Sequence, residues 1–138
     1  MTERTESGQA PVEFTGCRPV LPVEDMAVSL DHYLTVLGFT EEWRWSGDEA
    51  DPVPNFVSLF RGHFQLFLAR RPSPIQAVEI VVGLRSVADV NQIHGEYSSS
   101  GAIVEEPPSA RPWGTYEMRI RDPDRHLLRL LTNMPRQT

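Results

Sequence analysis

The sequence repeats one order of predicted elements at a nearly constant distance. In each half, a short apolar strand is followed by an amphipathic helix that ends at a glycine, and three strands come next. Superposing the halves aligns Val23 with Leu84, Gly38 with Gly101 and His63 with His126, at offsets of 61, 63 and 63 residues. Such repetition indicates an internal duplication. We therefore predict two tandem βαβββ modules, one over about residues 17–70 and the other over about residues 76–132.

Local patterns place the elements of the first module. Residues 17–23 alternate as an irregular strand that would turn Cys17 toward the helix. Asp25 stands at a helix N-cap position, and apolar residues at helical spacing continue to a stop at Gly38. Strands are then expected over 41–46 and on both sides of a turn at 61–62.

The second module follows the same scheme. Residues 78–84 read as a strand, Ser86 can cap a helix, and Gly101 can end it. A short strand over 102–106 would lead into a loop over 107–114, and two strands, over 115–121 and 126–133, would close the module.

A four-stranded sheet with one helix leaves its second face uncovered. Two such modules can cover that face together, and the concave cleft between their curved sheets is the default ligand site. We therefore predict an α+β fold in a single domain over residues 15–134, with a disordered tail over 1–14 and a short tail over 135–138.

Composition narrows the possible partners. The formal charge is −6 and all 13 basic residues are arginine, which excludes a P-loop lysine, a pyridoxal-phosphate Schiff base and any lysine general base. The acidic balance argues against nucleic acid or an anionic membrane as partner. No apolar stretch is long enough for a membrane span, and the N-terminus lacks the apolar core of a signal peptide. The single Cys17 indicates an intracellular chain, so we expect a cytoplasmic location.

Three strings of residues resemble a known superfamily. These are PVLPVEDMAVSLDHYLTVLGF, RGHFQLFL and RPWGTYEMRIRDPDRHLLRL. They are similar to the glyoxalase, bleomycin-resistance and extradiol dioxygenase superfamily, also called vicinal oxygen chelate, and most of all to bleomycin-resistance proteins. The resemblance spans about residues 17–132 and implies the two-module fold. The fold hosts metal-dependent lyases, dioxygenases and epoxide-opening enzymes as well as drug-sequestering proteins without catalysis, so it does not by itself fix the function.

The resemblance also points to four positions where metal-dependent members carry their ligands. In this sequence they are occupied by Arg18, Gln65, Glu79 and Arg129. A guanidinium has no free lone pair and stays charged, so it cannot ligate a cation. Glu79 and Gln65 alone would hold a divalent ion poorly, since catalytic sites usually keep three protein ligands. We therefore expect no metal and no other cofactor.

Strand parity places these residues on the cleft side. Gln65 shares a face with Phe67, and Glu79 shares one with Val81. Two interpretations of the charges stay open. Glu79 can pair with one or both arginines and fill the old metal position with a salt bridge. Alternatively, one arginine is left free to hold a carboxylate or another anion of the ligand.

Large aromatic side chains are the second feature of the expected cleft. The resemblance maps ligand-groove aromatics onto Trp43, Phe56 and Trp113, with Gly114 allowing close backbone approach. Flat aromatic walls suit planar heteroaromatic ligands. The alternative is that each tryptophan packs against its own module or a dimer partner. Acidic residues near the rim would attract a cationic ligand, unless they only form a solvated loop; they are Glu41, Glu42, Asp48, Glu49 and Asp51.

We therefore predict a metal-free, non-catalytic protein that sequesters a flat, cationic, drug-like molecule, with bleomycin-type glycopeptides as the leading ligand. The resemblance implies a homodimer whose two chains build the groove, so the expected partners are a small molecule and a second copy. The alternative is a metal-dependent glyoxalase- or dioxygenase-type enzyme that uses unusual ligands such as Glu79, Gln65 and His63. A metal-free enzyme or a metabolite-sensing regulator is a third possibility. We assign no catalytic residue.

Overall fold

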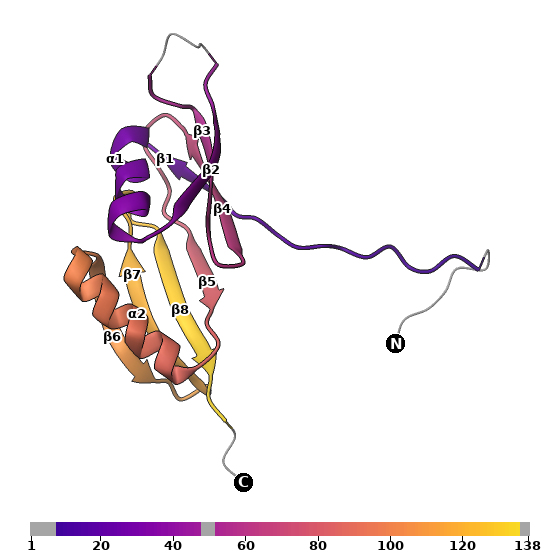
Figure 1. Cartoon of the computed structure of the whole chain (residues 1–138), viewed down its shortest axis with the longest axis vertical. Helices are drawn as coiled ribbons and strands as arrows, with labels where there is room; N and C mark the ends of the chain where they lie inside the picture. The colour runs from indigo at the N-terminus through magenta and orange to yellow at the C-terminus, as the bar shows by residue number, and fades with distance from the viewer. Residues whose placement is uncertain (1–7, 48–51, 136–138) are drawn as a thin grey trace.

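The computed structural model describes residues 8–47 and 52–135. Each half of the chain forms one helical segment and one four-stranded sheet (Figure 1). The first half contains β1 (Val20–Val23), α1 (Met26–Asp31), the π-helical turn η1 (His32–Val36), β2 (Thr40–Trp45), β3 (Phe56–Arg61) and β4 (Phe64–Arg70). The second contains β5 (Glu79–Gly83), α2 (Val87–Ser100), β6 (Ile103–Ala110), β7 (Thr115–Arg121) and β8 (Leu127–Asn133).

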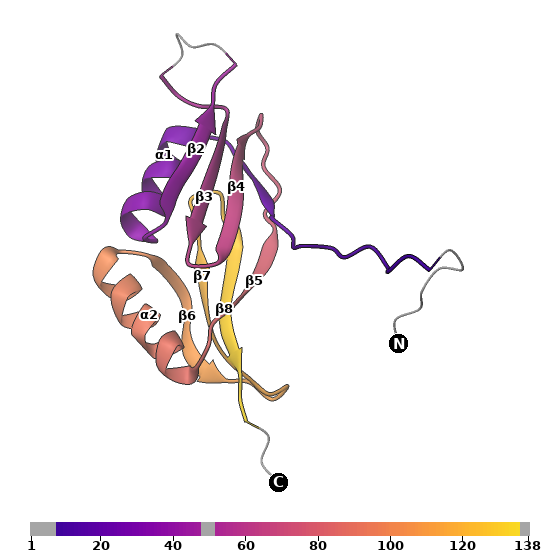
Figure 2. The ribbon, with the colours of Figure 1, turned by 45° about the vertical axis from the view of Figure 1, so that its right-hand side comes forward.

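The two sheets have matching strand orders, β1-β4-β3-β2 and β5-β8-β7-β6. In each, the strand before the helix pairs in parallel with the last strand of its module, and the other pairs are antiparallel. The helices lie one beyond the other along the long axis, beside their sheets (Figure 2). The prediction of an α+β fold with two tandem βαβββ modules is confirmed.

The predicted helix caps are present. The side chain of Asp25 accepts a hydrogen bond from the backbone N–H of Val28, and Ser86 accepts one from that of Asp89. Gly101 ends α2 in the left-handed conformation, at a φ of 89°. One feature is new: the first helix widens into η1 after Asp31, and the N–H of Leu37 bonds to the carbonyl of His32, five residues back.

Two predicted strand boundaries are wrong. The first strand begins at Val20, so Cys17 precedes it and is exposed instead of facing the helix. Strand β6 continues through Pro107 and Pro108, where a loop was expected. It is the edge strand of its sheet and shifts register along this stretch, so prolines interrupt no essential ladder hydrogen bonds.

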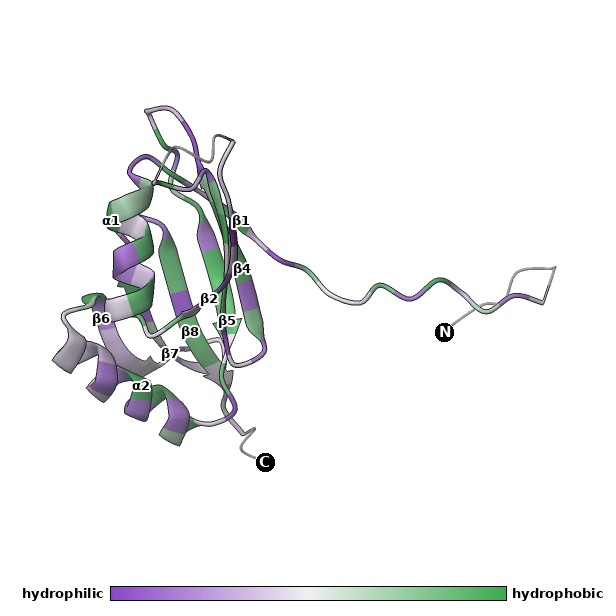
Figure 3. Ribbon diagram, turned by 45° about the horizontal axis from the view of Figure 1, so that its top comes forward, coloured by the Kyte–Doolittle hydropathy of each residue, from purple (hydrophilic) through white to green (hydrophobic). Residues whose placement is uncertain are grey.

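The two modules share one hydrophobic core. Leu21, Tyr33 and Leu59 from the first module belong to the same buried cluster as Met118 and Leu128 from the second. Strands at the centre of both sheets are mainly hydrophobic, with hydrophilic interruptions (Figure 3). Burying both modules together gives this short chain one continuous core.

Polar contacts also join the modules at this seam. The hydroxyl of Tyr33 donates to Asp122 over 2.8 Å, and burial raises the pKa of both groups. The buried ring of His126 accepts the N–H of Val78 at Nδ1, so Nε2 carries the proton and donates to the carbonyl of Pro22 over 2.7 Å. These partners lie far apart in the sequence, and their hydrogen bonds fix how the modules meet.

The end of the first helical segment is capped from the second module. The carbonyl of Leu37 accepts the hydroxyl of Tyr97 over 2.8 Å, and the carbonyl of Val36 accepts the hydroxyl of Ser100 over 2.7 Å. A helix end leaves carbonyls without partners within the helix, and here α2 supplies them.

The N-terminal segment over residues 8–19 carries no helix or strand and runs away from the body of the molecule (Figure 1). Residues 1–7 of the predicted tail over 1–14, and residues 136–138 of the predicted tail over 135–138, lie outside the described residues. Neither helix in the described part of the chain has the length and apolar character needed to cross a bilayer.

Candidate functional site

Each sheet has a face that its own helix does not cover, and we call these the open faces. On the first sheet, register places Trp43 opposite Ser58, and Ser58 opposite Phe67. Two pairs further along, and so on the same face, Trp45 lies opposite Phe56. Side chains of directly opposed residues point to the same face, so the pairing gathers these residues on one surface.

Three aromatic rings form a continuous patch on this face. Trp43 stacks on Phe56 with ring centroids 5.8 Å apart and planes 15° apart. Phe67 lies 5.7 Å from Trp43 and 5.2 Å from Phe56. We call these three residues the aromatic wall. Trp43 is still 44% exposed, so the patch offers ring surface to a ligand or a partner chain.

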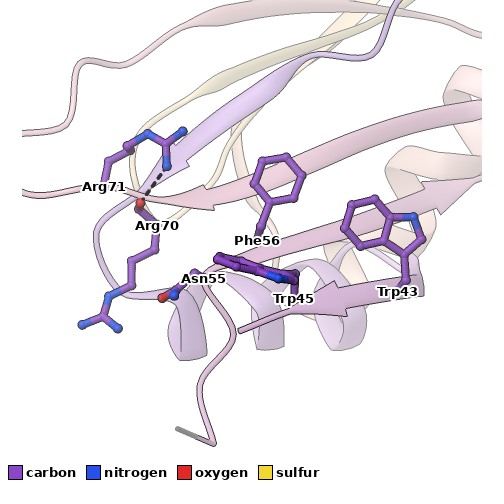
Figure 4. Close-up of a pocket in the computed structure, with 6 residues that line it drawn as sticks. All are labelled: Trp43, Trp45, Asn55, Phe56, Arg70 and Arg71. Carbon is purple, nitrogen blue, oxygen red and sulfur yellow. Dashed lines mark hydrogen bonds between the residues drawn. The ribbon is translucent and has the colours of Figure 1, made fainter. Parts of the chain in front are cut away.

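A pocket of about 370 Å³ lies at one end of the aromatic wall (Figure 4). Its lining residues are Trp43, Trp45, Asn55, Phe56, Arg70 and Arg71. The aromatic rings lie on one side and the two arginines on the other, with the two guanidinium groups pointing away from each other, and Asn55 lies between the rings and Arg70 (Figure 4). A Cβ at Gly47 would come within 3.3 Å of the Asn55 amide and 3.4 Å of the Trp45 ring, so the missing side chain lets these two groups sit close.

The other end of the same face is polar. The Nε–H of Arg18 donates to the amide oxygen of Gln65, and the amide nitrogen of Gln65 donates to Glu42 over 2.8 Å. Ser58 also donates to Glu42, over 3.0 Å. The open face is therefore divided along the strands into an aromatic half and a hydrogen-bonded polar half.

The open face of the second sheet is filled by paired charges centred on Glu117. This carboxylate is fully buried and accepts hydrogen bonds from Nε and Nη2 of Arg129 over 2.8 and 3.0 Å. Those bonds hold the pKa of Glu117 below its usual range, although burial opposes the shift, and they raise the pKa of Arg129. Arg111 and Arg119 also approach Glu117, at 3.9 and 3.8 Å.

The four positions suggested by the resemblance are split into two pairs. Arg18 bonds to Gln65 on the first sheet, and Arg129 bonds to Glu79 over 3.2 Å on the second. Of the two charge interpretations, the salt bridge is present between Arg129 and Glu79. Arg18 pairs with a neutral amide and with no carboxylate in the part of the chain that the structure describes.

The donor set on these faces does not fit a metal ion. Nη1 of Arg129 holds Glu79, and its other nitrogens hold Glu117, so a guanidinium stands where a ligand would have to bind. His63 is exposed. In residues 8–47 and 52–135, no three His, Cys, Asp or Glu side chains gather as a metal would require.

Trp113 and Gly114 lie apart from the aromatic wall in sequence and in module. They occupy the turn between β6 and β7, where Trp113 is 59% exposed and has no ring contact in the described part of the chain. Gly114 has a φ of 101°, a backbone conformation that favours glycine whether or not the residue contacts a ligand.

Several residues of these surfaces were not predicted. Asn55, Arg70 and Arg71 line the pocket. The two adjacent arginines at the end of the FQLFLARR string could have indicated a positively charged strand end, but the alternation of strand faces alone takes no account of them. Glu117 was not among the predicted cleft residues either, although it alternates with Thr115 and Arg119 along one face of β7. Among the rim acids, Asp48, Glu49 and Asp51 lie outside the described residues, and Glu41 pairs with Arg44 over 2.7 Å.

Comparison with known proteins gives one family match. The family model described as Glyoxalase/Bleomycin resistance protein/Dioxygenase superfamily matches residues 16–130. No curated protein is significantly similar to the chain.

Solved structures share the fold at low sequence identity. A glyoxalase/bleomycin resistance protein/dioxygenase from Nocardioides is 18% identical, with a TM-score of 0.69 over 93% of this chain and 92% of its own. TioX from Micromonospora sp. ML1 is 19% identical, with a TM-score of 0.67 over 90% and 100%. Lactoylglutathione lyase from Agrobacterium tumefaciens is 16% identical, with a TM-score of 0.68 over 86% and 93%. At these identities the likeness extends to the fold alone.

Proposed function

Because this chain belongs to the Glyoxalase/Bleomycin resistance protein/Dioxygenase superfamily, we propose that it is a metal-free protein that binds a flat aromatic small molecule without transforming it. The single observation that carries the proposal is the aromatic wall of Trp43, Phe56 and Phe67 beside a pocket of about 370 Å³. This volume lies within the range of small-molecule sites, and stacked rings favour planar ligands.

The donor set supports the proposed absence of a bound metal. Arg18 and Arg129 stand at two of the four positions where the family places ligands, and Arg129 already engages Glu79. The metal-dependent alternative would need Glu79, Gln65 and His63 to converge on one ion. Elemental analysis of the purified protein decides between the two: we expect far less than one zinc, nickel, iron or manganese per chain. A stoichiometric metal that survives dialysis would contradict the proposal.

A second copy of the chain would complete the groove. Both open faces carry exposed apolar side chains, among them Trp43 on the first sheet and Val81, 56% exposed, on the second. Covering these surfaces removes apolar area from water, which favours association. We propose a homodimer in which the second module of the partner faces the aromatic wall. Light scattering coupled to size exclusion should give twice the mass of one 15.6 kDa chain; a monomer at micromolar concentration would count against it.

Calorimetric titration with 2-naphthalenemethanol, a flat neutral probe, tests the binding function. We expect Trp43→Ala to weaken binding about tenfold, equivalent to about 1.4 kcal/mol, because the stacking surface is removed. Val28→Ala is the matched control, since Val28 is 51% exposed on α1 and does not line the pocket. Equal affinity of the two variants would place the ligand elsewhere.

Bleomycin is the probe that the family resemblance suggests. The proposed bleomycin-binding role predicts quenching of tryptophan fluorescence at sub-micromolar drug and weaker quenching after Trp113→Ala, if the Trp113 of one chain reaches the groove of the other. Absence of quenching at about 100 μM, a weak-binding concentration, would rule out bleomycin as a ligand.

A further inference from the structure

The charged groups at the pocket differ in sign from those expected at the rim. Two guanidinium groups, on Arg70 and Arg71, line it together with the aromatic rings. Nη1 of Arg71 donates to the backbone carbonyl of Arg70, and neither side chain forms an ion pair in the part of the chain that the structure describes. Among the residues that the structure describes, two positive charges therefore lie beside an apolar surface without an ion pair.

The arginines of the second sheet, by contrast, are paired with acids. Arg111, Arg119, Arg121 and Arg129 each lie within 4.0 Å of at least one glutamate. Paired guanidinium groups have little free capacity for a ligand anion, because their donors are already engaged. Arg70 and Arg71 keep most of their N–H donors free. They therefore differ from the paired arginines of the second sheet in the number of free donors as well as in position.

The acids on the aromatic face do not compensate these two charges. Glu42 already accepts hydrogen bonds from Ser58 and Gln65 and does not line the pocket. Among the described residues of the lining, Asn55 adds a neutral amide to the two arginines. Arg70 also borders a second, more polar hollow beside α1, whose lining includes Glu24, Asp25 and Asp124, and Arg71 does not line that hollow. Arg71 is therefore the better reporter for the aromatic pocket.

From this arrangement we infer that the pocket takes a planar aromatic anion, whose ring system lies on Trp43 and Phe56 and whose carboxylate or other oxyanion is attracted by the positive charges of Arg70 and Arg71. The inference rests on the proposed binding function and deepens it, and it replaces the expected cation. Guanidinium groups offer paired donors that match the geometry of a carboxylate. Asn55, between the rings and Arg70, can donate an additional hydrogen bond to the anion.

Three probes of one shape test the sign of the charge. They are 2-naphthoate, the neutral 2-naphthalenemethanol and the cationic 2-naphthylmethylamine, titrated into the full chain by calorimetry at low salt. We expect naphthoate to bind at least tenfold more tightly than the amine, with the alcohol between them. Raising the salt to about 0.5 M should weaken naphthoate binding and leave the alcohol unchanged, because salt screens exposed charges.

Variants then assign the residues. Arg71→Gln should weaken naphthoate binding about tenfold, equivalent to about 1.4 kcal/mol, and leave the alcohol within about twofold. Arg70→Gln should act in the same direction. Arg85→Gln is the control, since its side chain is 94% exposed and lies outside the pocket. Arg18→Gln tests whether the polar half of the face holds the anion instead.

The outcomes separate this inference from the binding function. Equal binding of the three probes, or preference for the amine, would overturn the anion and leave the binding function in place. Preference for naphthoate that survives Arg70→Gln and Arg71→Gln but is lost with Arg18→Gln would overturn the assignment to these two arginines. No binding of any probe at about 1 mM, the limit of weak affinity, would overturn both the inference and the proposed binding function.

Discussion

Replacing Glu117 with glutamine tests whether the paired charges on the second sheet support the fold. The carboxylate of Glu117 is fully buried and accepts two bonds from Arg129, at 2.8 and 3.0 Å, and one from Thr115 at 3.2 Å. Glutamine keeps the shape but loses the negative charge. It also turns an NH2 donor toward the donors of Arg129, so the guanidinium loses at least one charge-assisted bond.

The size of the effect follows from burial. Removing one partner of a buried ion pair costs about 3–5 kcal/mol. The lower end applies here because the Arg129 side chain is 19% exposed and keeps its bond to Glu79. We therefore expect Glu117→Gln to lower the unfolding free energy by about 3 kcal/mol, which for a chain of this length lowers Tm by about 10 °C.

Thermal unfolding followed by circular dichroism measures the loss, and Glu105→Gln is the control. Glu105 pairs with Arg121 on the same sheet, but its side chain is 41% exposed. An exposed pair contributes about 0–1 kcal/mol, so this control should barely move Tm. Equal losses for the two variants, or a higher Tm for Glu117→Gln, would refute the account of a stabilising buried carboxylate.

Acid pH gives an independent check on the same residue. Hydrogen bonds from Arg129 lower the pKa of Glu117 in the folded chain below its ordinary value of about 4.5. A lowered pKa contributes stability that is present above the unfolded value and is lost as pH falls through the folded value. The difference in unfolding free energy between the unmodified chain and Glu117→Gln should therefore be full near neutral pH and shrink below about pH 4.5. A difference that stays constant down to about pH 3 would contradict this origin.

Other substitutions test the seam and two glycines. Tyr33→Phe should lower the unfolding free energy by about 1.5–3 kcal/mol, because it removes a buried hydrogen bond to Asp122. Urea unfolding measures the loss as a lower midpoint, and an unchanged midpoint would mean that the bond adds nothing. Gly101→Ala should cost about 1–2 kcal/mol in thermal unfolding, since φ is 89° but nothing lies within 4 Å of the added Cβ. Gly38→Ala should cost more, because a Cβ there would come within 2.5 Å of Nη1 of Arg61; equal losses would show that this contact relaxes freely.

The sequence by itself determined the elements and their faces. Asp25, Ser86 and Gly101 act at the helix ends where their positions indicated, because capping is a local matter between residues three or four apart. Alternation along β4 likewise predicted that Gln65 and Phe67 share one face, and the structure places both on the open face while Leu66 and Leu68 are buried. The repeated order of elements predicted two modules of the same architecture, because each half of the sequence carries the same local signals.

Only the tertiary structure decided which groups meet on the open faces. The pairing of β7 with β8 sets Arg119 opposite Arg129 and brings Glu117 within reach, and no periodicity within either strand specifies that register. Similarly, Arg70 and Arg71 reach the aromatic rings because β4 ends where β2 and β3 place Trp45 and Phe56. Contacts between distant segments depend on how strands align in three dimensions, so the positive charges beside the aromatic rings became visible only in the folded chain.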